Sequence, residues 1–118
     1  MGVVYDNLDK NDIAIDYYKK AIILDPKYAL SYYNLGLQYA KKEEYIEAVN
    51  YYKQYIELNP NNANVYNNLG MAYNALNNFN EAINSYKKAL EVNSEHEGAL
   101  ANLKKLEEDE NELLNAKK

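Results

Sequence analysis

Histidine, cysteine and serine are the side chains from which many catalytic and metal sites are built, and this sequence offers few of them. It has one histidine, His96, and no cysteine among 118 residues. Nucleophilic or acid–base catalysis needs several such groups to converge, and a zinc site needs further nitrogen or sulfur ligands beside His96. We therefore expect no catalytic residue, no metal site, no cofactor and no enzymatic activity, and we interpret His96 as a surface residue without a role.

The stretch from Asp6 to Asp12 is rich in oxygen ligands and is a second place where chemistry could occur. Leu8 and Lys10, however, occupy positions where a calcium loop of the EF-hand type needs oxygen ligands, and the glycine of such a loop is missing. We interpret the stretch as a turn between a short helix over residues 1–8 and a second helix with an acidic, N-capping start. No metal binding is expected here.

Charge and composition exclude two further classes of partner. The net charge is −5 and the sequence contains no arginine, whereas binding to nucleic acid needs clustered cations and favours the guanidinium group. The longest apolar runs are far shorter than the roughly 18 residues of a membrane-spanning helix, and Met1 is not followed by a targeting segment. The lack of cysteine fits the cytosol and many other compartments equally well, and we take a cytoplasmic location as the expectation.

The sequence repeats itself when it is shifted by 34 residues. Glycine, tyrosine, alanine and a second tyrosine recur at four registers, and the turn proline recurs at a fifth. The recurring residues are Gly2, Gly36 and Gly70; Tyr5, Tyr39 and Tyr73; Ala14, Ala48 and Ala82; Tyr18, Tyr52 and Tyr86; and Pro26 and Pro60. A fixed period of this length is typical of solenoid architectures.

The spacing within each period identifies the family that the chain resembles. The middle unit has Tyr32-x2-Leu35-Gly36-x2-Tyr39, then Ala48-x3-Tyr52 and Pro60, and the next unit repeats this order. The pattern resembles the tetratricopeptide repeat (TPR) family, with tyrosine where the family pattern has tryptophan and phenylalanine. The resemblance implies an all-α, right-handed TPR superhelix, an α-solenoid of antiparallel helix pairs.

The same register gives the expected boundaries. Residues 1–93 should form the repeats, with a truncated repeat at 1–27 and further repeats at 28–61 and 62–94, and residues 95–118 should form a C-terminal capping helix and acidic tail. After the stub helix, helices are predicted over residues 11–24, 28–41, 44–57, 63–75, 78–91 and 95–116.

Glycine within a helix costs about 1 kcal/mol relative to alanine, so its recurrence indicates a packing requirement. We expect helix pairs to cross closely at Gly36, opposite the small Ala48, while aromatic side chains fill the flanking gaps. Tyr55 stands where the flanking repeats have Ala21 and Ala89, which predicts local repacking around this larger side chain.

Both ends of the chain depart from the repeat. Met1 has the register of Leu35, so the first repeat starts partway through its first helix and leaves Met1, Val3 and Val4 without a partner helix. We expect such a helix to precede the segment or to come from another molecule. At the other end, the acidic run Glu107–Glu112 fits the solvated face of a capping helix, and an interaction tail is the alternative.

A second stripe on the first helix of each repeat is left over after packing, and in TPR proteins this stripe lines the concave groove. The predicted peptide-binding residues are Leu30, Tyr33, Asn34, Leu37, Lys41, Asn64, Asn67, Asn68, Met71, Asn102 and Lys105. Three of them, Asn34, Asn68 and Asn102, share one register and resemble the asparagine ladder with which some TPR superhelices hold a peptide backbone. An amide both donates and accepts hydrogen bonds, as a backbone requires. Solvated asparagines in an asparagine-rich chain fit the same pattern equally well.

The partner expected from these residues is a protein or an extended peptide, neutral to acidic. Some TPR domains clamp a C-terminal carboxylate with cations, but Asn64 and Asn68 stand where such a clamp would need them, and only Asn34 matches it. The sequence thus favours a protein–protein interaction domain that binds an extended peptide. The alternative is a structural element that self-assembles through its open repeat ends, which implies a weak homo-oligomer through the truncated N-terminal repeat.

Overall fold

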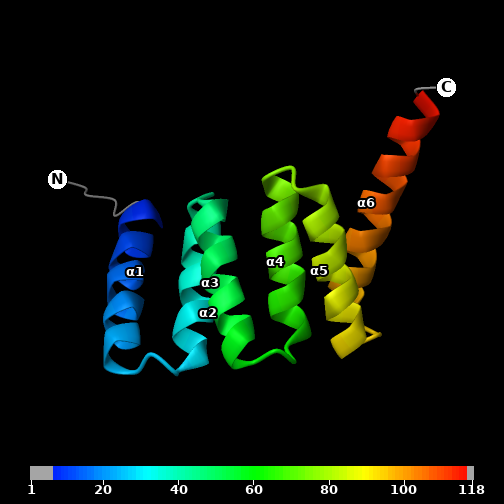
Figure 1. The fold of residues 1–118 in the computed structure, drawn as a ribbon. Coiled ribbons are helices and arrows are strands. Elements are labelled where there is room, and N and C mark those ends of the chain that lie inside the picture. Colours follow the sequence, from blue (N-terminus) through cyan, green and yellow to red (C-terminus); the bar gives the residue numbers. More distant parts are fainter. Residues whose placement is uncertain (1–6, 117–118) are drawn as a thin grey trace. The chain divides into compact units, whose positions relative to one another are not determined.

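The computed structural model describes residues 7–116, with side chains from Lys10 onward. Within these residues it contains six helices and no strand (Figure 1). The helices are α1 (Asn7–Leu24), α2 (Ala29–Lys41), α3 (Tyr45–Leu58), α4 (Ala63–Ala75), α5 (Phe79–Val92) and α6 (Glu97–Ala116). The prediction of an all-α fold is confirmed.

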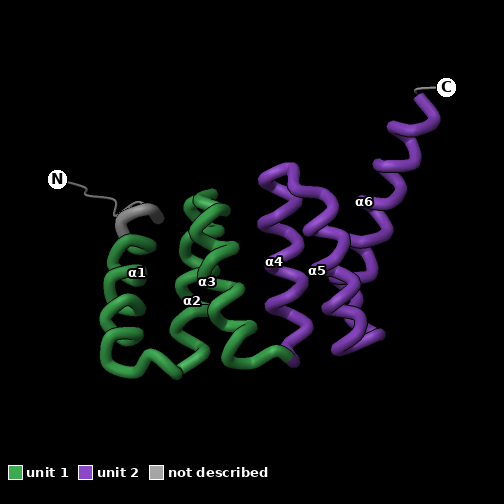
Figure 2. The backbone as a smooth tube through the Cα atoms, viewed as in Figure 1, with its two compact units in different colours: residues 1–60 green, residues 61–118 purple. Residues whose placement is uncertain are grey.

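The helices are grouped into two compact units (Figure 2), residues 1–60 and residues 61–118. Unit 1 contains α1, α2 and α3, and unit 2 contains α4, α5 and α6. Only a few residues connect consecutive helices within a unit, so neighbouring helices are antiparallel, as in a helical hairpin.

Two of the three four-residue connections between the described helices contain a proline. Pro26 and Pro60 follow helices that end at Leu24 and Leu58, because proline disfavours a helical conformation of the residue before it and offers no N–H to continue the ladder. After Pro60, the side chain of Asn62 accepts hydrogen bonds from two backbone N–H groups in the first turn of α4, at 3.0 and 3.4 Å. This cap starts the next helix at the predicted place.

The tighter turns within each helix pair depend on one left-handed residue. Glu43 and Asn77 are one period apart, and each has a φ of 62°. The residue after each donates its backbone N–H to the carbonyl of a tyrosine, Glu44 to Tyr39 and Asn78 to Tyr73, both at 2.9 Å. The repeated bond closes the same turn in both units.

The start of α1 corrects one prediction. Instead of the expected turn near Asp9 and Lys10, the helix is continuous from Asn7 to Leu24. Asp and Lys each cost less than about 0.7 kcal/mol in a helix interior, whereas a break would leave backbone groups without intrahelical partners. The rest of the predicted stub, including Met1, Val3 and Val4, lies outside the described residues.

The recurrent glycines are explained by an aromatic ring rather than by a small residue. A Cβ atom added at Gly36 would overlap Tyr52, with its Cδ1 at 2.5 Å, and one added at Gly70 would lie 2.5 Å from Cε1 of Tyr86. The expectation that Gly36 is required by Ala48 was therefore wrong about the partner. The glycine makes room for the ring of a tyrosine four residues further along the second helix, and the alanine is buried beside it.

Unit 1 has an aromatic core between its helices. Tyr39 and Tyr51 are stacked with their ring centroids 5.5 Å apart, and the ammonium group of Lys19 from α1 lies 5.8 Å from the Tyr39 centroid. A hydrogen bond with Tyr39 raises the pKa of Lys19, although desolvation opposes the shift. The same face of α2 buries Tyr32 and Leu35, as its sequence stripe predicts.

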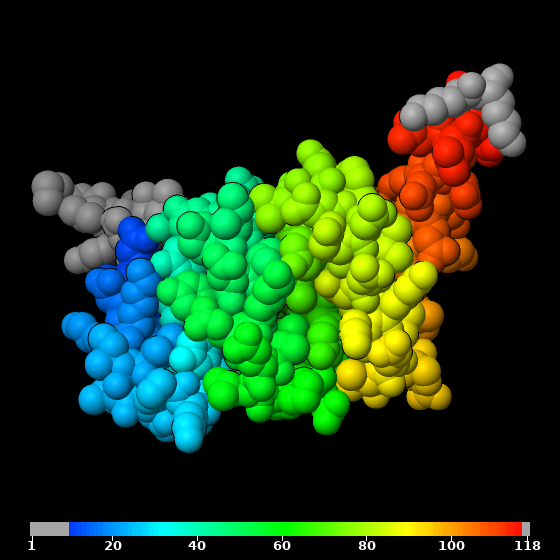
Figure 3. Space-filling model, in the orientation of Figure 1, coloured from blue at the N-terminus to red at the C-terminus, as the bar shows by residue number. Residues whose placement is uncertain are grey.

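Unit 2 is closed by the first half of α6. Ala99 is buried with Ala63 and Ala89, and Leu106 is buried with Ala82 and Tyr86. The second half of α6 extends beyond the other two helices of the unit (Figures 1 and 3). Leu113 and Leu114 on this part are exposed.

Candidate functional site

In unit 1, the predicted binding stripe lies on α2 and is partly used for packing. Tyr33 lies between two aromatic side chains of α3, with its ring centroid 6.2 Å from that of Tyr52 and 5.7 Å from that of Tyr55. Asn34 and Leu37 are half-buried, and the remaining members, Leu30 and Lys41, are exposed. Tyr33, a predicted binding residue, therefore also packs within the fold of unit 1.

Tyr55 shows how the second repeat accommodates its large side chain. It is buried, its ring packs against Tyr33, and its hydroxyl accepts a hydrogen bond from the amide of Asn59 at 3.0 Å. The repacking predicted from the alanines at this register in the flanking repeats thus takes the form of a tyrosine pair within unit 1.

In unit 2, two of the predicted groove asparagines bind each other. The Asn102 amide on α6 donates to Oδ1 of Asn67 on α4 at 3.0 Å, and the Asn67 amide lies 3.9 Å from the Met71 sulfur. Asn67 is only 9% exposed. The bond uses one of the two N–H groups of Asn102 and leaves its carbonyl for other contacts.

His96 has a defined role, which corrects its interpretation as a surface residue without one. It precedes α6, and its Nδ1 accepts the backbone N–H of Ala99 at 3.0 Å, which caps the helix. Its Nε2 lies 2.7 Å from Oδ1 of Asn64 on α4. With Nδ1 acting as an acceptor, the neutral tautomer carries its proton on Nε2, which donates to Asn64.

Gly98 allows α6 to approach these side chains. An added Cβ would lie 3.1 Å from Cε1 of His96 and 3.2 Å from the amide nitrogen of Asn67. One residue just before α6 and two in its first half thus meet three residues of α4 in one polar cluster: His96, Gly98 and Asn102 with Asn64, Asn67 and Met71. The sequence placed Asn64, Asn67, Met71 and Asn102 on the predicted binding stripe, but it gave no signal that His96 and Gly98 would join them.

A hollow of about 240 Å³ lies beside this cluster. Its lining consists of Met71, Asn74, Ala75, Tyr86, Asn102, Lys105, Leu106 and Asp109. Three of the predicted groove residues, Met71, Asn102 and Lys105, are therefore brought together. A thioether, an amide and an ammonium group next to a carboxylate can accommodate a polar chain with some apolar character.

Among residues 7–116, no group of three or more His, Asp or Glu side chains is arranged to hold a metal ion. In the same residues, no helix is long and apolar enough to span a membrane.

Antiparallel helix pairs that recur with a 34-residue period define an α-helical repeat protein. One profile of the tetratricopeptide repeat matches residues 29–62 and again residues 63–96, and a second profile of the same repeat matches residues 1–28. The chain belongs to the TPR family, whose domains serve in protein interaction. Among curated proteins, none matches the sequence.

Solved structures agree with this assignment. The first TPR of Spaghetti (RPAP3) bound to the HSP90 peptide SRMEEVD is 27% identical with a TM-score of 0.81, over 85% of this chain and 79% of that one. The second TPR domain of human RPAP3 in complex with the HSP70 peptide SGPTIEEVD is 28% identical with a TM-score of 0.79, over 83% and 82%. The MamA protein is 36% identical with a TM-score of 0.69, over 73% of this chain and 47% of that one.

Proposed function

We propose that this chain binds an extended peptide, neutral to acidic, through the stripe that its sequence predicts on α2, α4 and α6. The family assignment and the two RPAP3 complexes, each with a peptide bound, support a peptide as the ligand. The observation that carries the proposal is the hollow in which Met71, Asn102 and Lys105 meet. Catalysis forms no part of the proposed function, and neither nucleic acid nor a membrane is a proposed partner.

The chemistry of the hollow favours recognition of a peptide backbone. The carbonyl and second N–H of Asn102 can pair with a peptide N–H and C=O, while Lys105 adds attraction for an acidic side chain. Asp109, which lines the same hollow, moderates that attraction. Asn34 and Asn68 are the other proposed contacts to the backbone.

A carboxylate clamp like that of some TPR domains is not part of the proposal. Asn64 and Asn68 stand where such a clamp would need cations, and Oδ1 of Asn64 already accepts a bond from His96. A peptide that ends in a free carboxylate should therefore bind no more tightly than the same peptide with an amidated end. The peptide SGPTIEEVD in both forms is a direct probe of this point.

The test begins with a peptide array probed with the purified chain, followed by calorimetry on the array peptide that binds best. Asn34→Ala, Asn68→Ala and Asn102→Ala should each weaken binding by about two- to twelve-fold, which corresponds to one hydrogen bond of about 0.5–1.5 kcal/mol. Asn84→Ala, on an exposed position of α5, is the matched control and should bind like the parent chain. Lys105→Gln and Lys41→Gln should have smaller effects and reduce the salt dependence. Unchanged affinity in all three asparagine variants would remove the ladder from the proposal.

Self-assembly through the first repeat is the second candidate, and one feature of α1 favours it. Ile13 and Tyr17 lie one helical turn apart and are both largely exposed, which leaves an apolar strip on the outer helix of unit 1. In sedimentation equilibrium, a concentration-dependent dimer that weakens in Tyr17→Lys would support this candidate. A monomer at all accessible concentrations would exclude it.

A further inference from the structure

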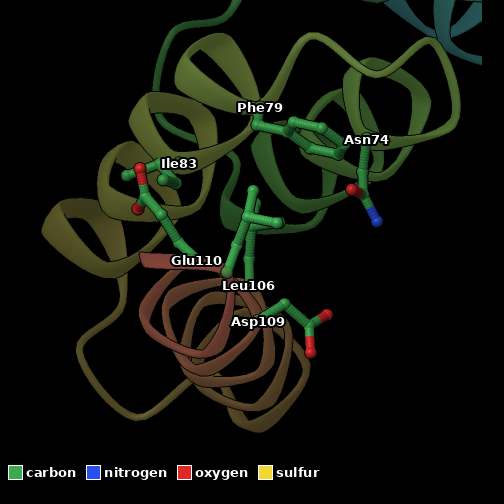
Figure 4. A pocket seen from close by; sticks show the side chains of 7 residues that line it. Asn74, Phe79, Ile83, Leu106, Asp109 and Glu110 are labelled. Atoms are coloured by element: carbon green, nitrogen blue, oxygen red, sulfur yellow. The ribbon is translucent and has the colours of Figure 1, made fainter. Parts of the chain in front are cut away.

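A cleft of about 320 Å³ lies between the start of α5 and the second half of α6, within unit 2. Its lining is Asn74, Phe79, Ile83, Leu106, Asp109, Glu110 and Leu113, none of which belongs to the predicted binding stripe. In Figure 4, the Leu106 side chain points from α6 toward Ile83 and Phe79 of α5, while Asp109 and Glu110 lie on either side of it. The cleft thus has an apolar floor and two carboxylates at its rim.

The cleft is open because α6 does not turn back. Glu110 and Leu113 have the 34-residue register of Leu76 and Phe79, where the preceding helix pair has its turn and the start of its second helix. In α6 the same register continues as helix to Ala116, so no further helix of the described chain covers this side. Phe79 remains 46% exposed and Leu113 60% exposed.

Asp109 shares the neighbouring hollow with Lys105, whereas Glu110 at the rim lines no hollow with a lysine. The run from Glu107 to Glu112 contains no lysine or arginine, and the last turn of α6 has no basic residue either. Within residues 10–116, neither Asp109 nor Glu110 belongs to an ion pair, whereas Lys42 and Lys88 pair with other carboxylates.

We propose that this cleft docks a partner segment with a bulky apolar side chain flanked by lysine or arginine. The apolar anchor would cover Phe79, Ile83 and Leu113 above the Leu106 floor, and the flanking cations would meet Asp109 and Glu110. A second copy of this chain fits less well, because its net charge is −5 and the acidic runs of two copies would repel. The site differs in residues and in preferred charge from the peptide stripe proposed above, although both hollows share Asn74, Leu106 and Asp109.

Two synthetic peptides test the preference for charge. Each has eight residues with a central Leu-Phe pair, flanked by lysines in one peptide and by glutamates in the other. In nitrogen–proton correlation spectra of the full chain, the lysine peptide should shift the backbone signals of Phe79, Ile83 and Leu113, and the glutamate peptide should not. Equal shifts with both peptides, no shift with the lysine peptide, or shifts at these residues on raising the protein concentration alone would overturn the proposal. The last outcome would identify a second copy as the occupant.

Matched variants test the position of the site. Glu110→Lys should weaken binding of the lysine peptide about five-fold or more, because it replaces an attractive charge at the rim by a repulsive one. Glu108→Lys makes the same change of net charge on an exposed residue of α6 that does not line the cleft, and it should keep affinity within about two-fold of the parent chain. Equal losses of affinity in the two variants would show that the effect depends on net charge and not on position, and would overturn the proposed site.

The apolar contact has its own pair of variants. Leu113 lines the cleft and is 60% exposed, whereas Leu114 is 56% exposed and does not line it. Leu113→Ala should weaken binding about three- to ten-fold, since it removes apolar area from the contact, and Leu114→Ala should not. Both residues are exposed, so circular dichroism should confirm that both variants remain folded. A larger loss in Leu114→Ala than in Leu113→Ala would contradict the proposed lining.

Discussion

Replacing Gly36 by alanine brings two opposing effects of known size into conflict. Alanine is favoured over glycine inside a helix by about 1 kcal/mol, so helix propensity alone predicts a more stable protein. The added Cβ, however, would overlap the ring of Tyr52, with Cδ1 at 2.5 Å, whereas ordinary contact begins at 3.4 Å. The sign of the stability change shows which effect is larger.

The surroundings of Tyr52 decide the expected magnitude. The side chain is only 1% exposed, and its ring already contacts that of Tyr33, so it has little space into which to retreat. Overpacking of a core costs about 1–3 kcal/mol and occasionally more. Because the ring cannot retreat, we take the cost at the upper end of this range, about 3 kcal/mol. After the gain in helix propensity of about 1 kcal/mol is subtracted, Gly36→Ala should destabilise the protein by about 2 kcal/mol.

Urea unfolding followed by circular dichroism measures this change, with Gly98→Ala as the control. At Gly98 the atoms nearest to an added Cβ belong to the side chains of His96 and Asn67, at 3.1 and 3.2 Å, and must give by a few tenths of an ångström. This small cost opposes the gain in helix propensity, so that variant should stay within about 0.5 kcal/mol of the parent. Combining Gly36→Ala with Tyr52→Leu should remove most of the cost of the alanine, because the ring is absent. If Gly36→Ala is as stable as the parent chain or more stable, the steric explanation for the recurrent glycines is wrong.

Two further predictions concern the cap of α6 and alkaline pH. His96→Ala should lower the free energy of unfolding by about 1–2 kcal/mol, since it removes the cap on Ala99 and the bond to Asn64. His96→Asn should recover part of this loss, because asparagine restores an acceptor that can cap the helix. Equal urea midpoints for the two variants would contradict the role of the cap. Burial raises the pKa of Tyr52 and of Tyr86 above the ordinary value of 10.0, so above pH 10 the unfolded chain releases phenolic protons that the folded chain retains. The stability that these two groups contribute is fully present below pH 10 and should decrease as the pH rises further. In urea titrations at pH 9 to 11, Tyr52→Phe should make that decrease shallower. An identical dependence of the unfolding free energy on pH in the variant and the parent chain would contradict the effect of burial.

The fold could be predicted from sequence because its determinants are local and repeated. Pro26 and Pro60 fix two of the connections, and Asn77 takes the left-handed conformation that a tight turn requires. The prediction was wrong at Asp9 and Lys10, where the register of the repeat indicated a turn but neither residue prevents a continuous helix. A position in the register of the repeat thus predicts a turn only where the residue itself disfavours a continuous helix.

The candidate site could be predicted only in part. The shared register brought Asn102 and Met71 into the set of binding residues, and the structure brings them to one hollow with Lys105. Register could not indicate that Asn102 would bind Asn67, because a period relates equivalent positions and not the positions that meet across two helices. The peptide contacts of Asn34 and Asn68 stay predictions.

The sequence by itself determined the period, the family and the helical stripes that are buried, because each follows from spacing along one helix or from one repeat to the next. The tertiary structure decided which side chain meets which. It placed the ring of Tyr52 against Gly36, made His96 the cap of α6 and a partner of Asn64, and left the cleft at Phe79 open because α6 does not turn. These contacts depend on the distance and angle between helices, which are set by the packing of all their side chains together and are not contained in the spacing of any single stripe.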